Sequence, residues 1–307
     1  MKTQSTKIRR PLAKGFTLLE ILAATVVATI LLTVSLQILG GSSETVKAAD
    51  KKRNAQTHLR TALDRFAADF STAMLTGGTT AIWREGQDGS ELTFLSRSRP
   101  ALPTSAGSSD PPRGAAIGYA LLNHQETSGG SSYPELKRGD APVAFDSDLT
   151  EVFKKIPDTN DSIWNGWEPL GTGIVRFHIS FLLDDGTITQ APPAYSMISP
   201  QTGNDVSFQN GLTLPSGAVA IAFSERNKPR AATNARHVKA LIVAAAAVDR
   251  DVLNQTLRAN KLDEINSLGE PGPGETSLEV WEKNLTRIDF APLLQNIRFQ
   301  QRTIPVS

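Results

Sequence analysis

An uncharged apolar stretch near the N-terminus constrains the fold of this chain most strongly. The nineteen residues from Ile21 to Leu39 carry no charge. As a helix they are long enough to cross the hydrocarbon core of a bilayer, which needs about 20 apolar residues. One carboxylate, Glu20, stands directly before the stretch, and a lone acid there is costly in lipid. We therefore expect a membrane helix in which Glu20 has a specific role.

The residues before this stretch are basic. Lys2, Lys7, Arg9, Arg10 and Lys14 precede it, with no acid among them. Such a positive flank favours retention on the cytoplasmic side of the membrane. An ordinary secretory signal has a shorter apolar core, followed by a cleavage site of small residues. Two interpretations remain: a plain signal anchor, which leaves Glu20 unexplained, and a leader that is processed differently.

The segment Lys14-Gly15-Phe16-Thr17-Leu18-Leu19-Glu20 and the apolar run behind it resemble the class III signal of type IV prepilins and of type II secretion pseudopilins. The resemblance implies that prepilin peptidase cuts after Gly15 and methylates the new N-terminus, Phe16. It also implies that the carboxylate of Glu20 pairs with the Phe16 ammonium of a neighbouring subunit. Such a buried polar pair sets the register of assembly.

A helical pattern continues beyond the membrane stretch. Gly40 and Gly41 interrupt the apolar run and are a plausible kink or softening point. Spacings of three or four then draw one apolar stripe, formed by Leu59, Leu63, Phe66, Phe70 and Met74. Gly77 and Gly78 are expected to end the helix. The sequence thus predicts a long helix from Phe16 to about Leu75, whose later part packs against a sheet.

The rest of the chain is strand-like, with turn-rich inserts. The segment Ile174–Leu183 alternates apolar and polar residues, which predicts a strand with one buried and one solvent-exposed face, His178 lying on the exposed one. Asp184-Asp185-Gly186 follows as a hairpin turn. Further strands are expected at 91–95, 116–124, 218–224 and 237–248. Residues 99–114, rich in proline, form an exposed loop.

The expected fold class is α+β and pilin-like: a long N-terminal helix with a membrane-inserted front half, packed on a twisted antiparallel β-sheet head. Its parts are a leader peptide (1–15), a transmembrane assembly helix (16–40), an amphipathic helix stalk (41–76), a β-sheet head (77–248) and a C-terminal extension with short helices (249–307). The extension should contain helices near 250–265 and 277–285, then a short helix and an edge strand within 289–306. It either caps the sheet or contacts a neighbouring subunit.

The order of these parts resembles the minor pseudopilin J and minor pilin W group. The matching segments in the later part of the chain are the expected strand Ile174–Leu183, the turn Asp185-Gly186, and Leu214-Pro215, which leads into a strand that includes Val219. A further resemblance is to the prepilin-type proteins of the Verru_Chthon cassette group. The chain departs from the J-type ending from Val238 onward.

The sequence contains no catalytic or metal-binding motif with suitable spacing. The four histidines, His58, His124, His178 and His237, are far apart, and the absence of cysteine excludes a thiolate site. Asp158-x-Asn160-x-Ser162 looks like the start of a calcium loop, but Ile163 and Pro169 stand where glycine and glutamate are needed. We interpret the segment as a turn with Asx capping and keep a calcium loop as the alternative. We expect no enzyme, no cofactor and no metal. Trp164 and Trp167 form a local core or, alternatively, a partner-binding patch.

The resemblance implies a minor pseudopilin with a structural role in protein export by a type II secretion-type pseudopilus. The alternatives are a minor type IV pilin for adhesion, motility or DNA uptake, and a membrane-anchored hydrolase. A net charge of +1 gives no case for nucleic acid, although Arg226, Lys228, Arg230 and Arg236 form a mildly basic run.

The implied partners are prepilin peptidase, other pilins or pseudopilins through their N-terminal helices, and an inner-membrane assembly platform. The implied location is the bacterial inner membrane, crossed once, with the head in the periplasm. The pilus or pseudopilus would take up the subunit from there.

Overall fold

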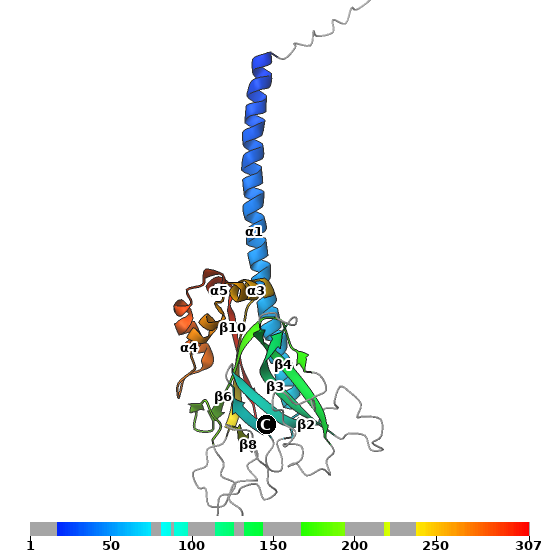
Figure 1. Cartoon of the computed structure of the whole chain (residues 1–307), viewed down its shortest axis with the longest axis vertical. Coiled ribbons are helices and arrows are strands. Elements are labelled where there is room, and N and C mark those ends of the chain that lie inside the picture. The colour runs from blue at the N-terminus through cyan, green and yellow to red at the C-terminus, as the bar shows by residue number, and fades with distance from the viewer. Residues whose placement is uncertain are drawn as a thin grey trace, which may run out of the picture. The chain divides into compact units, whose positions relative to one another are not determined.

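The computed structural model describes residues 17–74, 81–86, 89–97, 114–125, 132–143, 167–193, 218–221 and 238–306. The chain divides into two compact units, residues 1–50 and residues 51–307. The first unit contains the front of a single long helix, and the second contains the rest of that helix, two sheets and several short helices (Figure 1).

The long helix α1 runs from Leu18 to Ser71 and continues through Gly40 and Gly41. It ends earlier than the sequence pattern predicts, because the chain leaves the helix to pair with a strand. Ala73 forms a bridge with Ser96, and the Met74 N–H donates to the Leu95 carbonyl at 2.8 Å. Met74 therefore does not belong to the helical stripe, and Gly77 and Gly78 lie outside the described residues.

The strands form two antiparallel sheets rather than one (Figure 1). The larger has the order β5 (Glu168–Pro169), β4 (Ser132–Val143), β3 (Gly114–Gln125), β2 (Ser90–Ser96), β1 (Ala81–Glu85) and β8 (Ala218–Ile221). The smaller has the order β10 (Arg298–Pro305), β9 (Val238–Ala247), β6 (Ile174–Leu183) and β7 (Ile188–Thr189). The long N-terminal helix and antiparallel strands confirm the expected α+β class, and β10 is an edge strand as predicted.

The two sheets meet where the β1–β2 hairpin contacts β6. Gly89 forms a parallel bridge with Phe177, and the Ile179 N–H donates to the Ser90 hydroxyl at 3.0 Å. Gly89 has a φ of +148°, and a Cβ there would lie 2.2 Å from the Phe177 carbonyl oxygen. Only glycine permits this close approach of the two backbones.

The main core lies between the later part of α1 and the sheets. The stripe residues Leu59, Leu63, Phe66 and Phe70 are between 0% and 2% exposed, which confirms the predicted packing. The Phe66 ring meets the Tyr119 ring edge-on, with centroids 4.7 Å apart. Aromatic pairs in this arrangement stabilise a core beyond the area they bury.

The C-terminal extension forms a second, smaller core against β6 and β9. It contains α3 (Arg250–Arg258), η2 (Leu262–Leu268), α4 (Ser277–Asn284), η3 (Leu285–Arg287) and α5 (Ala291–Asn296). Val175 and Ala246 of the sheet share this core with Leu268, Trp281 and Leu293 of the extension. The extension therefore caps the sheet, one of the two roles considered for it.

The prediction that β6 has a solvent-exposed face was wrong. Arg176, His178 and Ser180 are all buried, because the extension covers the face on which they lie. The alternation of apolar and polar residues was real. The polar residues face a second layer of protein instead of water.

Candidate functional site

The front of α1 exposes its apolar side chains. From Leu18 to Leu39 the large apolar residues that face solvent are between 46% and 85% exposed. Among the described residues, α1 is the one helix long and apolar enough to cross a membrane, with a mean hydropathy of 2.2 over its most apolar window. We call residues 17–39 the assembly segment. Its apolar surface is compatible with a single membrane crossing, which would cover it.

Glu20 caps the start of the helix. The Thr17 N–H donates to Glu20 Oε2 at 2.9 Å, and the Glu20 N–H donates to Thr17 Oγ1 at 3.3 Å. This reciprocal pair is a capping box, which satisfies two backbone donors that an α-helix leaves without partners. A carboxylate at this end also interacts favourably with the helix dipole. Glu20 therefore has a role within a single chain. The Thr17-x-x-Glu20 spacing indicates this role, in addition to the pairing expected from the sequence.

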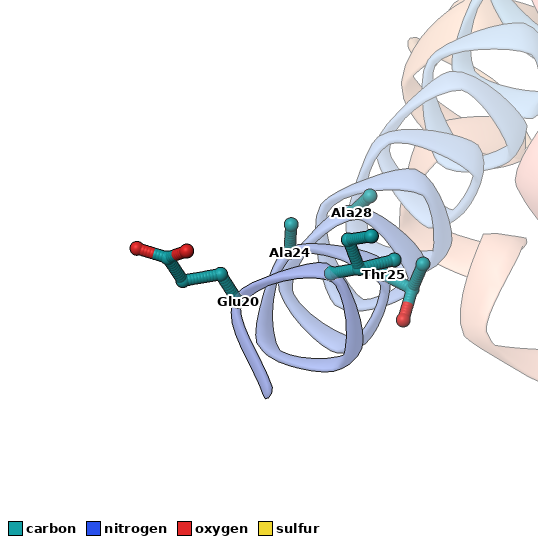
Figure 2. A pocket seen from close by; sticks show the side chains of 5 residues that line it. Glu20, Ala24, Thr25 and Ala28 are labelled. Carbon is teal, nitrogen blue, oxygen red and sulfur yellow. The ribbon is translucent and has the colours of Figure 1, made fainter. Parts of the chain in front are cut away.

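The surface beside Glu20 is open and lined by small residues (Figure 2). Ala24, Thr25 and Ala28 line it with Glu20 and Ile21, while the Glu20 side chain extends outward from the helix. Small side chains allow a neighbouring helix to approach the backbone closely.

Three threonines of the assembly segment satisfy their hydroxyls within the helix. The hydroxyls of Thr25, Thr29 and Thr33 donate to backbone carbonyls of the preceding turn at 2.8 Å. A hydroxyl bonded in this way needs no water, so it is tolerated in lipid. These polar residues are therefore compatible with a membrane environment.

Several predicted site residues lie outside the described residues. They are the cleavage pair Gly15 and Phe16, the leader cations Lys7, Arg9, Arg10 and Lys14, the Asp158–Ser162 segment, Trp164, and the basic run 226–236. Trp167 is described and is half-buried.

The covered face of β6 holds a polar cluster formed by Arg176, His178, Glu270 and Ser277. The Ser277 hydroxyl lies 2.8 Å from His178 Nδ1, and Arg176 pairs with the Glu270 carboxylate. His178 Nε2 is 3.8 Å from the other oxygen of Glu270. We call these four residues the β6 polar cluster.

Burial governs protonation in this cluster. Burial, assisted by the nearby charge of Arg176, lowers the pKa of His178 to about 4, so its imidazole is neutral at pH 7. Burial raises the pKa of Glu270, against the opposing effect of Arg176, and the like charge of Glu85 raises it further. The cluster thus combines a neutral imidazole with the Glu270 carboxylate, which the nearby Glu85 carboxylate repels.

The cluster brings a serine, a histidine and a glutamate together, which bears on the hydrolase alternative. Ser277 is 1% exposed, in the first turn of α4, so a substrate carbonyl cannot approach its hydroxyl in this conformation. A nucleophile must reach its substrate. The arrangement is better explained as a contact that holds the extension on β6.

The β6 polar cluster could not be predicted from the sequence. Its members come from β6, the loop after η2 and the start of α4, and Arg176 is separated from Glu270 by 94 positions. The only local signal was the polar half of the β6 alternation, which was interpreted as facing water.

Comparison with known proteins gives weak structural likeness and no match in sequence. No protein-family model matches the sequence, and no curated protein matches it. Among solved structures, the chain is similar to the type IV-like pilin TTHA1219 from Thermus thermophilus, with 12% identity and a TM-score of 0.39. The match covers 82% of this chain and 95% of that one. At that level the likeness gives no information on function.

Proposed function

We propose that this chain is a pilin-like subunit and, more specifically, a minor pseudopilin of a type II secretion-type pseudopilus. The observation that carries the proposal is the contrast between the two parts of α1. The large apolar residues from Leu59 to Phe70 are buried in the head, whereas those from Leu18 to Leu39 are exposed. Burying one large apolar side chain contributes about 1.5–3 kcal/mol, so the exposed part needs lipid or other helices to cover it.

The leader supports assembly rather than simple anchoring. A cut after Gly15 would place a new ammonium on Phe16, next to the Thr17–Glu20 capping box. A positive charge at a helix N-terminus is unfavourable, and the Glu20 carboxylate offsets it. In a bundle of subunits the same carboxylate can pair with a neighbour's ammonium, which fixes the register. Methylation of Phe16 by prepilin peptidase belongs to the same proposal.

The proposed partners follow from this arrangement. They are prepilin peptidase, other pilins or pseudopilins through their assembly segments, and an inner-membrane assembly platform. The basic leader keeps the N-terminus cytoplasmic, so the head lies in the periplasm of a single-pass protein. The head contributes docking surface and structure, and we assign it no catalytic reaction.

A minor type IV pilin is the second candidate, because the same assembly segment serves both systems. Deletion of the gene in its host separates the two. A secretion role predicts loss of specific extracellular proteins with surface pili unchanged, restored by the wild-type gene but not by a Gly15→Leu variant. Loss of pili, adhesion or DNA uptake with normal secretion would favour the pilin. No change in either would contradict both.

A further inference from the structure

Three side chains that can bind a metal converge at the edge of the β6 polar cluster. They are Glu85 at the end of β1, His178 on β6 and Glu270 in the loop that follows η2. One ligand atom from each lies within 4.8 Å of the other two. The three come from separate elements of the head, so their convergence depends on the tertiary fold.

The imidazole of His178 is oriented toward the carboxylates. Its Nδ1 is occupied by the Ser277 hydroxyl at 2.8 Å, and the residue is 2% exposed. Nε2 is therefore the nitrogen that faces Glu270, at 3.8 Å from Oε2. A histidine that binds a metal through one nitrogen usually forms a hydrogen bond through the other, which fixes the ring.

Each carboxylate has an oxygen available for a cation. Arg176 pairs with Oε1 of Glu270 and leaves Oε2 facing His178. Within the described part of the chain, Glu85 makes no ion pair through its side chain. The two carboxylates are close enough to repel, and a cation between them would remove that repulsion.

The β1–β2 hairpin fixes the position of Glu85. The Gly86 N–H donates to the Gly89 carbonyl at 2.8 Å, and Gly89 bridges to Phe177, the residue before His178. The hairpin is thus held on β6 by this bridge and by the Ile179 N–H, which donates to the Ser90 hydroxyl. Ligands on such rigid elements are held more precisely than ligands on free loops.

We propose that Glu85, His178 and Glu270 bind a divalent transition-metal ion, with Zn²⁺ as the expected occupant. One imidazole nitrogen and two carboxylate oxygens suit Zn²⁺, whereas Ca²⁺ and Mg²⁺ take sites made of oxygen alone. The ion fastens the loop of the C-terminal extension to β1 and β6. This inference is independent of the proposed assembly role, and it opposes the sequence-based expectation of no metal.

The binding test uses the full chain in detergent, stripped with EDTA and then titrated with Zn²⁺ in a calorimeter. The wild type should bind one Zn²⁺ per chain, and Glu85→Gln should weaken binding at least tenfold. Glu85 is exposed and unpaired among the described residues, so this variant should fold normally. Glu282→Gln, an exposed carboxylate on α4, is the matched control and should bind as the wild type does.

Two further measurements check which residues bind the ion and whether the ion fastens the loop of the extension. Co²⁺ in place of Zn²⁺ should give visible absorption bands that change in His178→Gln. Zn²⁺ should slow hydrogen exchange in residues 269–274 of the wild type but not of Glu85→Gln. Absence of stoichiometric Zn²⁺ binding by the wild type, or binding by Glu85→Gln and Glu270→Gln as tight as that of the wild type, would overturn the proposal. Displacement of Zn²⁺ by equimolar Ca²⁺ would contradict the assignment of the site to a transition metal.

Discussion

The Tyr119 hydroxyl donates a 2.7 Å hydrogen bond to Oδ2 of Asp69, joining β3 to the last turns of α1 inside the core. Arg138 Nε of β4 donates to the same oxygen at 2.5 Å. Burial and the Asp69 carboxylate raise the pKa of Tyr119 well above its usual range, so it stays a donor at any ordinary pH. This network ties the buried part of the helix to the larger sheet.

Asp69→Ala should destabilise the protein by about 3–5 kcal/mol, because it removes the buried carboxylate to which both Arg138 and Tyr119 donate. Among the described residues, Arg138 then keeps only its pair with Asp140, at 3.2 Å. Asp64→Ala is the control on the same helix, since Asp64 is half exposed and pairs with Arg60 and Arg302 at the surface. It should cost less than about 1 kcal/mol. Urea unfolding followed by circular dichroism measures both. Equal losses of unfolding free energy in the two variants would contradict the role given to Asp69.

Substitutions at Gly173 and Gly186 distinguish the cost of backbone strain from the cost of a steric clash. Their φ angles are +82° and +83°, but a Cβ on Gly173 would lie 1.9 Å from the Val248 oxygen, whereas one on Gly186 meets nothing within 4 Å. Gly186→Ala should cost about 1–2 kcal/mol from the left-handed conformation alone. Gly173→Ala should cost about 1–3 kcal/mol more. The difference in unfolding free energy tests this, and Gly186→Ala being the worse variant would refute it.

Trp281 and Trp83 are both buried but differ in the hydrogen bonding of the indole N–H. The Trp281 N–H donates to the Gly269 carbonyl at 3.2 Å, whereas the buried N–H of Trp83 has no hydrogen-bond partner among the described residues. Trp281→Phe leaves a carbonyl without its donor and should cost about 1–3 kcal/mol beyond the lost packing. Trp83→Phe should lose packing alone. Thermal unfolding of the two variants measures the difference, and a larger loss for Trp83→Phe would count against it.

Two substitutions of Glu20 distinguish capping from charge pairing. Glu20→Gln keeps an oxygen that accepts from Thr17 but removes the charge, while Glu20→Ala removes both. If Glu20 pairs with a neighbour's ammonium, both variants should fail to assemble while remaining in the membrane. Recovery of sheared or cross-linked fibres is the measurement. Normal assembly of Glu20→Gln with failure of Glu20→Ala would show that capping is sufficient.

Local patterns in the sequence predict the strands and turns that local chemistry determines. The β6 strand has the bounds expected from its alternation, and Gly186 adopts the left-handed conformation that the Asp184-Asp185-Gly186 turn requires. The stripe from Leu59 to Phe70 packs as its spacing predicts. In each case the residues that carry the signal are neighbours in the chain.

The features that sequence reasoning missed depend on contacts between distant residues. Whether Arg176 and His178 face water depends on an extension that begins about seventy residues later. The end of α1 depends on pairing between Met74 and Leu95. The convergence of Glu85, His178 and Glu270 likewise has no local signal, whereas the Thr17–Glu20 cap had one.

The central claim is that residues 1–15 form a leader removed by prepilin peptidase. Intact-mass and N-terminal analysis of the membrane protein, with and without a co-expressed peptidase, tests it most directly. The account predicts a peptidase-dependent N-terminus at Phe16, with or without one added methyl group, and no cut in Gly15→Leu. A full-length chain in both conditions would contradict the account and leave α1 as a plain membrane anchor.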